Sequence, residues 1–389
     1  MSKDLETNKN IKGVFFKLKR YGYIYEKIYD IDNIRYAIWK ASEKKRKQRR
    51  VEVILKNMDY YAYQIQKMLK EKTFTPSQPT IKTIQDSGKK RVIYKPKFYP
   101  DQIVHWALML QLEPIIMEGM YEYNCGSVTG RGTSYGQKTL RKWLDNDRRN
   151  TKYCLKMDIK KFYPSIDNNI LKEMFRKKIK DRDCLWLIDS IIDSAEGQPI
   201  GYYTAQWFSN FFLQGLDHYI KERLKIKYYI RYVDDLVLLG SNKRKLHKAR
   251  KAIETHLNSI RLSVKGNWQV FRVDKRAIDF LGFRFFRNKT ILRKRNALRI
   301  RRRVRKIAEK GYLNEKDASA IISYWGWIKR SNSFYFYHKY VKPVVPVKLA
   351  RKVVSENAKI RQIDAQREYV AKLKTRRRVQ TGRICGDTG

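Results

Sequence analysis

Two adjacent aspartates between two apolar runs constrain the fold of this chain more than any other feature. Residues 227–240 read as two strands, rich in β-branched and aromatic side chains, with only Asp234 and Asp235 between them. Such runs favour strands, and Asp tolerates a positive φ, so the pattern predicts a tight hairpin with both carboxylates at its exposed tip. Neighbouring carboxylates repel each other, and divalent cations neutralise them well. A solvated turn is the alternative interpretation of this acid pair taken alone.

The charge of the chain indicates a polyanionic partner. The 389 residues include 87 Lys and Arg against 38 Asp and Glu, a formal charge of +49. Because 42% of the residues are hydrophobic and 13% are aromatic, the chain can build packed cores and is not a disordered basic tail. Its length predicts two or three packing units. Nucleic acid is the commonest polyanion, so an enzyme that acts only on a small neutral metabolite is disfavoured.

The sequence carries no export or membrane signal that we can identify. The segment from Met1 to Asn10 is polar and charged, and no apolar run reaches the roughly 18–20 residues that span a bilayer. The four cysteines are scattered, with no CxxC pair and no histidine at ligand spacing. We therefore expect a cytoplasmic protein with no membrane partner, no disulfide framework and no structural zinc.

A second acid lies upstream in a similar setting. Asp158 closes an apolar run that begins at Tyr153, and the aromatic pair Phe162 and Tyr163 follows four and five residues later. If the two strands are sheet neighbours, Asp158 and Asp234 meet. Two Mg²⁺ ions about 3.5–4 Å apart on such oxygen ligands can activate a hydroxyl and stabilise a leaving pyrophosphate. The pattern therefore favours phosphoryl transfer on a nucleic acid.

These motifs resemble those of reverse transcriptases. Tyr232-Val-Asp-Asp235 is similar to their signature hairpin, and Asp158-Ile-Lys-Lys-Phe-Tyr163 is similar to their first catalytic motif. The resemblance implies an α+β right-hand polymerase fold, with fingers, a palm made of an antiparallel sheet backed by helices, and an α-helical thumb. The implied segments are a basic N-terminal extension (1–24), fingers with part of the palm (25–150), palm (151–290), thumb (291–342) and a basic C-terminal extension (343–389).

The resemblance also implies the catalytic residues. Tyr163 falls at the position of the steric gate, a ring that rejects a ribose 2′-hydroxyl, with an ordinary core tyrosine as the alternative. Lys265 is similar to the lysine that protonates pyrophosphate, with a surface lysine as the alternative. The implied metal site, for two Mg²⁺ ions or alternatively Mn²⁺, consists of Asp158, Ile159, Asp234 and Asp235.

Further implied contacts are with the incoming dNTP and with the nucleic acid. Arg91, with Lys89, matches the hairpin of the fingers that grips the triphosphate, and Arg binds phosphate in a bidentate manner. The other nucleotide-binding residues that the resemblance implies are Phe162, Ile200, Gly201 and Gln206. The implied contacts with primer and template come from Tyr232, Phe280, Leu281 and Gly282.

A strongly basic segment follows the predicted palm. Residues 293–310 hold ten Lys or Arg and one acid around a narrow apolar stripe, which predicts an amphipathic helix. We expect Arg299, Arg302 and Arg303 of this helix to contact the phosphates of an RNA/DNA hybrid. A solvated helix face is the alternative.

One motif resembles a particular group of reverse transcriptases. Pro199-Ile200-Gly201 stands where many members read Pro-Gln-Gly, and a similar Ile-Gly form is typical of the enzymes of diversity-generating retroelements. This resemblance implies a bacterial or phage enzyme that copies a dedicated structured RNA into cDNA with errors opposite template adenine, aided by a small accessory protein oligomer. An antiphage-defence enzyme, another solitary or group II intron-like reverse transcriptase, and a non-catalytic RNA-binding scaffold are the alternatives.

Overall fold

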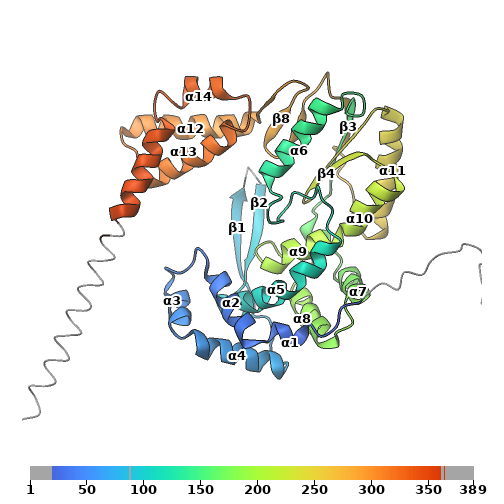
Figure 1. Ribbon diagram of the computed structural model, residues 1–389, viewed down its shortest axis with the longest axis vertical. Helices are drawn as coiled ribbons and strands as arrows, with labels where there is room; N and C mark the ends of the chain where they lie inside the picture. Colours follow the sequence, from blue (N-terminus) through green and yellow to red (C-terminus); the bar gives the residue numbers. More distant parts are fainter. Residues whose placement is uncertain (1–19, 87–88, 361–362, 364–389) are drawn as a thin grey trace, which may run out of the picture. The chain divides into compact units, whose positions relative to one another are not determined.

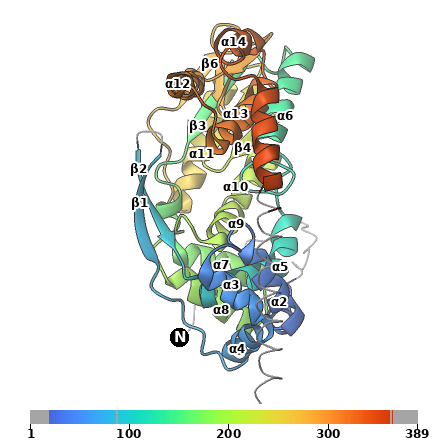
Figure 2. The same cartoon turned by 90° about the vertical axis from the view of Figure 1, so that its left-hand side faces the viewer.

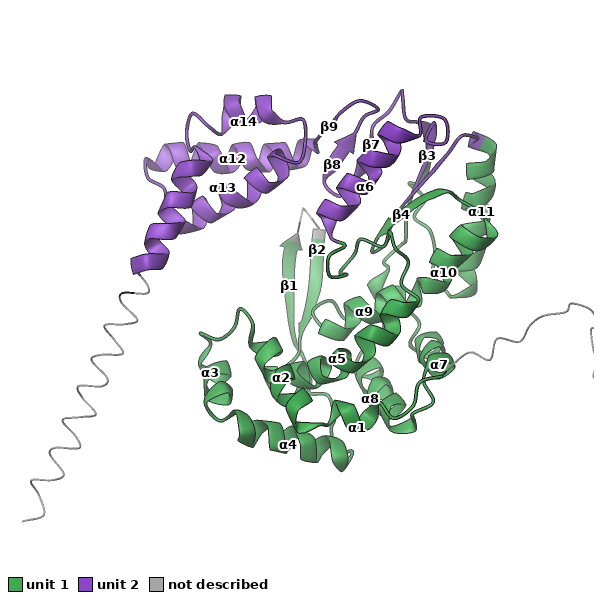
Figure 3. Ribbon diagram, viewed as in Figure 1, with its two compact units in different colours: residues 1–131, 157–236, 244–269 green, residues 132–156, 237–243, 270–389 purple. Residues whose placement is uncertain are grey.

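The computed structural model describes residues 20–86, 89–360 and 363. The chain forms two compact units, shown in Figure 3. Unit 1 comprises residues 1–131, 157–236 and 244–269, and unit 2 comprises residues 132–156, 237–243 and 270–389. The predicted boundaries of fingers, palm and thumb stay a prediction, and most of the two predicted basic extensions lies outside the described residues.

Helices predominate, with short strands between them, as Figure 1 shows. No helix in the described part of the chain has both the length and the apolarity to cross a membrane. The helices between residues 20 and 223 are α1 (Tyr25–Ile28), α2 (Ile31–Ser42), α3 (Arg49–Lys56), α4 (Met58–Lys70), the π-helix η1 (Phe98–Gln102), α5 (Ile103–Glu118), α6 (Thr133–Asn146), the 3₁₀-helix η2 (Tyr163–Ser165), α7 (Asn168–Lys178), α8 (Arg182–Asp193), α9 (Tyr203–Phe212), α10 (Gln214–His218) and the π-helix η3 (Tyr219–Arg223). The later helices are α11 (Lys243–Ser259), α12 (Lys294–Lys310), α13 (Glu315–Ile328) and α14 (Phe334–Tyr340).

The strands form three sheets. Figures 1 and 2 show β1 and β2 as a long two-stranded hairpin, and its register places Thr80 opposite Lys95. A four-stranded sheet has the order β4-β5-β3-β6, and a three-stranded antiparallel sheet has the order β7-β8-β9. The strands are β1 (Thr80–Asp86), β2 (Lys89–Lys95), β3 (Tyr153–Asp158), β4 (Tyr228–Tyr232), β5 (Asp235–Gly240), β6 (Gln269–Arg272), β7 (Ile278–Phe280), β8 (Phe283–Phe285) and β9 (Thr290–Leu292).

The core of unit 1 follows from simple sequence patterns. Helix α2 begins where the Asp30 carboxylate accepts the amides of Asp32 and Asn33, and it buries Ile34 and Ile38, which are four residues apart. In β5, of which residues 235–236 belong to unit 1 and residues 237–240 to unit 2, residues 236–239 are all buried, as expected for a strand covered on both faces. That buried strand fixes the position of the residues just before it, which carry the acids.

The basic helix predicted for residues 293–310 is observed in unit 2 as α12. Its apolar stripe, Ile300, Val304 and Ile307, is buried, while Arg302 is exposed. The helix ends at Gly311, whose φ of +72° gives a left-handed cap. The helix therefore presents its charge on the face opposite the buried stripe.

Candidate active site

The turn between β4 and β5 is shifted by one residue from the predicted one. The two turn residues are Val233 and Asp234, whereas Asp235 already begins β5. Val233 adopts a φ of +57°, a conformation that β-branched residues rarely take. The prediction of an Asp234-Asp235 turn was wrong because the apolar run of β5 pairs from Asp235 onward, which moves the left-handed position onto Val233. The turn therefore presents one acid rather than two at its tip.

Asp158 and Asp234 meet in the structure, as expected if their strands are sheet neighbours. Asp158 ends β3, and β5 lies beside β3 in the sheet. The amide of Ile159 donates to the Asp234 carbonyl at 3.0 Å, so the end of β3 is fastened to the turn. The carboxylates of both acids are about one third exposed, at 35% and 37%. These contacts form an acidic site that is partly open to solvent.

A lysine ammonium lies between the two carboxylates. Lys265 forms an ion pair with Asp158, and its Nζ lies 4.0 Å from an Asp234 oxygen. The Lys265 amide also donates to the Asp158 carbonyl at 2.8 Å. Burial, followed by the charge of Asp158, raises the pKa of Asp234 to about 6. Two acids this close favour a positive charge between them, which Lys265 supplies here.

The acid pair fits a divalent cation through the chemistry of its donors. Only oxygen ligands are offered, which suits a hard ion such as Mg²⁺ or Mn²⁺. Among the described residues, no three His, Cys, Asp or Glu side chains gather closely enough to hold an ion by themselves. Mg²⁺ usually takes one or two carboxylates and completes its shell with water and substrate phosphates. Asp158 and Asp234 fit such a site as its protein ligands, and the metal roles of Asp158, Ile159, Asp234 and Asp235 stay predictions.

Tyr163 lies beside this acidic site, next to the buried ring of Phe162. Burial raises the pKa of Tyr163 to about 12, and the charges of Asp234 and Tyr232 add to the rise. The guanidinium of Arg91, on β2, acts in the opposite direction. The predicted steric gate, the predicted phosphate-binding arginine and the predicted catalytic acid Asp234 are thus electrostatic neighbours. The side chain of Lys89 lies outside the described residues.

The segment with the unusual isoleucine joins β2 to the site. The Tyr94 amide of β2 donates to the Ile200 carbonyl at 2.8 Å, and Gly201 lies against the backbone of Tyr94. The amide of Gln198 donates to the Tyr163 carbonyl at 2.9 Å. Ile200 and Gly201 are therefore held between the predicted phosphate grip and the predicted gate. Gln206, by contrast, is exposed on α9.

The predicted contacts with nucleic acid in unit 2 include a second tight hairpin. Residues Leu281 and Gly282 form the turn between β7 and β8, and both have a positive φ, +53° and +85°. Phe280 is buried, and the Lys156 ammonium lies 5.3 Å from its ring centroid. The roles of these residues on a primer stay predictions.

The three arginines of α12 differ in their surroundings. Arg299 and Arg302 are exposed, whereas Arg303 donates to the buried Asp317 at 2.6 Å. Burial alone would raise the pKa of Asp317, but Lys310 and Arg303 outweigh this effect and lower the pKa. Arg303 therefore supports the packing of α12 on α13, and Arg302 is better placed for a phosphate.

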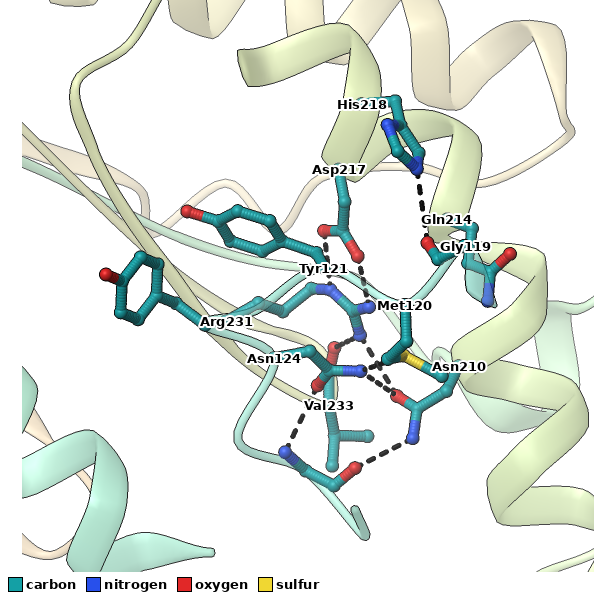
Figure 4. A network of polar contacts seen from close by, with 12 residues as sticks. Gly119, Met120, Tyr121, Asn124, Asn210, Gln214, Asp217, His218, Arg231 and Val233 are labelled. Carbon is teal, nitrogen blue, oxygen red and sulfur yellow. Dashed lines mark hydrogen bonds and ion pairs between the residues drawn. The ribbon is translucent and has the colours of Figure 1, made fainter. Parts of the chain in front are cut away.

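A buried polar network beneath the β4–β5 turn was not identified from the sequence. Arg231 and Asp217 are both fully buried and lie 2.5 Å apart, as Figure 4 shows. The signal that could have revealed it is an arginine within the apolar run of residues 229–232. A charged side chain at such a position requires a buried partner.

No curated protein matches the sequence. Among solved structures, apo telomerase from Candida tropicalis is 15% identical with a TM-score of 0.43, and the alignment covers 56% of this chain and 48% of that chain. Telomerase from Candida albicans, in complex with a fragment of telomeric RNA, is 14% identical with a TM-score of 0.40, over 54% of this chain and 44% of that chain. The chain thus spans about half the length of the telomerases that it matches.

The family model described as reverse transcriptase (RNA-dependent DNA polymerase) matches residues 40–285, which is more than half of the chain. The match includes Asp158, Tyr163, Asp234 and Lys265. It confirms the predicted α+β polymerase fold. Members of this family are RNA-directed DNA polymerases, and they generally use divalent metal ions. The chain belongs to the reverse transcriptase family.

Proposed function

We propose that this chain is a Mg²⁺-dependent enzyme that copies RNA into DNA at the site formed by Asp158 and Asp234. The single observation that supports this most is the meeting of these two carboxylates around the Lys265 ammonium. Neighbouring carboxylates repel each other, and the cations that the reaction requires would neutralise them. Mn²⁺ is the alternative ion.

The proposed reaction needs positioning more than covalent chemistry from the protein. The primer 3′-oxygen forms a bond to the α-phosphorus of a dNTP, and the bond from that phosphorus to the departing pyrophosphate breaks. Asp158 and Asp234 would hold the divalent ions, which neutralise phosphate charge when bound. Lys265 would donate a proton to the pyrophosphate, and Arg91 would bind the triphosphate. Tyr163 would exclude a 2′-hydroxyl by packing under the sugar.

Primer extension on an RNA template tests this proposal. We expect the wild type to incorporate dNTPs in preference to rNTPs and Asp234→Asn to lose at least about 10²–10³-fold in rate, as when one electrostatic group of an active site is removed. Asp279→Asn is the matched control, because Asp279 is a half-exposed acid of unit 2 that pairs with Arg293. Unchanged incorporation by Asp234→Asn, or no incorporation by the wild type, would refute the proposal. A preference for rNTPs would refute DNA synthesis.

We further propose that the chain serves a diversity-generating retroelement and copies a structured RNA with low fidelity at adenine. Support comes from Ile200, whose apolar side chain stands where a glutamine would offer a hydrogen bond near the nucleotide. We expect Ile200→Gln to reduce misincorporation opposite template adenine, measured by sequencing the cDNA. An error spectrum that is the same for both enzymes would contradict this assignment. Sequencing of co-purified RNA tests the template, and a mixture without a dominant structured RNA would argue against it.

We also propose that α12 binds the RNA/DNA hybrid. Arg299 and Arg302 are exposed on this basic helix. For each phosphate contact, the logarithm of the association constant should fall by about 0.7–0.9 for each tenfold rise in salt concentration. We expect Arg302→Gln to reduce this slope by roughly one contact, and an unchanged slope would contradict the contact.

A further inference from the structure

A buried ion pair lies directly beneath the turn that carries Asp234. The Arg231 guanidinium, on β4, donates through Nε and Nη2 to the Asp217 carboxylate of α10 at 2.9 and 2.5 Å. The Tyr229 hydroxyl donates to the same carboxylate at 2.7 Å. Because removing two charges from water is unfavourable, a buried pair stabilises a fold little more than apolar residues of equal size. We therefore expect the pair to matter through the backbone groups that it holds in place.

The guanidinium holds the backbone of the turn. Nη1 of Arg231 donates to the Val233 carbonyl at 3.1 Å and to the Asn210 side-chain oxygen at 3.2 Å, as Figure 4 shows. Val233 has a φ of +57°, which is strained for a β-branched residue. Its carbonyl belongs to the peptide group that joins Val233 to Asp234. Fixing this peptide therefore fixes the backbone from which the Asp234 carboxylate extends.

A loop fastens the same strand from its other side. The Cys125 amide donates to the Arg231 carbonyl at 2.8 Å, and the Arg231 amide donates to the Tyr123 carbonyl at 3.1 Å. The Asn210 amide group donates to the Gly126 carbonyl at 2.7 Å. A Cβ on Gly126 would lie 2.7 Å from the backbone nitrogen of Val233, so only glycine allows this approach. Loop, helix and turn thus share one buried polar centre.

We propose that Arg231 is a positioning residue that, held by Asp217 and Asn210, keeps the strained Val233 turn in the conformation that presents Asp234 to Asp158. The proposal rests on the proposed function, in which Asp234 serves the polymerase reaction. Arg231 itself lies in the interior and touches no reacting atom. Its geometry is specific to arginine, because one planar group serves a carboxylate, an amide oxygen and a main-chain carbonyl together.

The first test is the variant Arg231→Lys, which keeps a positive charge near Asp217 but loses the fork that reaches the Val233 carbonyl. We expect kcat for dNTP incorporation to fall by roughly 10- to 100-fold, as for a small misplacement of a catalytic group. The KM for dNTP should change less than about threefold, because the lost interaction orients the catalytic acid rather than the nucleotide. Arg250→Lys, at a largely buried arginine that pairs with Glu254 elsewhere in unit 1, is the matched control and should keep its kcat.

A second variant separates positioning from general stability. Glycine adopts a positive φ without strain, so Val233→Gly should need less support from Arg231. We expect the double variant Arg231→Lys/Val233→Gly to recover at least about threefold in kcat over Arg231→Lys, a coupling typical of residues in contact. A glycine added to a turn would not rescue a protein whose only defect is a weakened core.

Hydrogen exchange provides a readout that does not depend on activity. The Ile159 amide donates to the Asp234 carbonyl, so its protection reports on the turn. In Arg231→Lys we expect faster exchange at Ile159 and in residues 228–236, with unchanged exchange in α5. Equal loss of protection throughout unit 1, or wild-type exchange at Ile159 together with wild-type kcat, would overturn the proposal. If the wild type proved inactive, the proposed function would fail, while the exchange measurement would still decide whether Arg231 orders the turn.

Discussion

Two tight turns, β4–β5 in unit 1 and β7–β8 in unit 2, hold left-handed residues in different ways. The left-handed residue is Val233 in the first turn, and Leu281 followed by Gly282 in the second. In each, a side chain binds a turn carbonyl: Arg231 donates to Val233 at 3.1 Å, and Asn296 donates to Gly282 at 3.0 Å. Where glycine supplies one of the left-handed residues, a neutral amide binds the turn carbonyl. Where β-branched valine occupies the turn, a buried, paired guanidinium binds it.

This difference indicates which hairpin has the more demanding task. A strained residue persists only where its surroundings hold it, and such residues concentrate at functional sites. The β4–β5 turn carries Asp234, whose carboxylate must meet Asp158. The residues of the β7–β8 turn, Leu281 and Gly282, include no acid.

The largest expected effect comes from breaking the buried pair. Arg231→Met leaves the Asp217 carboxylate buried without its partner, which should lower the free energy of unfolding by about 3–5 kcal/mol. Arg35→Met is the control, because Arg35 pairs with Asp32 and Asp59 on the surface and should change stability by less than about 1 kcal/mol. Urea denaturation followed by circular dichroism measures both. Similar losses of unfolding free energy in the two variants would show that breaking the buried Arg231–Asp217 pair costs no more than breaking a surface pair.

The hairpin of unit 2 should respond to a different change. Gly282 has a φ of +85°, and a Cβ there would lie 2.7 Å from the Asn296 amide nitrogen. Gly282→Ala should therefore destabilise unit 2 by about 1–3 kcal/mol through backbone strain. The matched change at the other turn, Val233→Gly, relieves strain and should be much less destabilising. If both substitutions shifted the urea midpoint equally, the contrast between the hairpins would fail.

A smaller effect should appear with pH at a buried group that lacks such a network. Both ring nitrogens of His105 are buried without a hydrogen-bond partner, and burial lowers its pKa to about 3. Below pH 6.5 the unfolded chain gains a proton there that the folded chain does not bind, so stability falls as pH falls. From pH 7.5 to 5.5 we expect His105 to contribute a loss of about 1.4 kcal/mol.

The variant His105→Leu provides the comparison for this pH effect. Leucine neither titrates nor leaves polar nitrogens unsatisfied. The urea midpoint of the His105→Leu variant should therefore fall less than that of the wild type between pH 7.5 and 5.5. Parallel losses in the two proteins would show that other groups carry the pH dependence. Arg231 and His105 would then differ only in their hydrogen bonding, and not in whether the protein interior can hold each of them in its charged form.

The structure is predictable from this sequence where local pattern decides it. The β4–β5 strands and the basic helix α12 follow from apolar runs and helical spacing, and Asp158 and Asp234 meet because their strands are neighbours, the condition on which we expected them to meet. The predicted turn was misplaced by one residue, because the preference of Asp for positive φ is weaker than the strand pairing and buried contacts that place Val233 there. The partner of Arg231 was not predicted, because Asp217 lies 14 residues away on a helix and no local period connects the two.

The central claim is that Asp158 and Asp234 act as one catalytic pair, and single-turnover primer extension on an RNA template tests it most directly. The measurement compares Asp158→Asn, Asp234→Asn and the double variant. Because residues that act as a unit are not additive, we predict that each single variant loses at least about 10²–10³-fold in rate and that the double variant is no slower than the slower single one. Losses that multiply in the double variant, or a single variant that retains wild-type rate, would contradict the account.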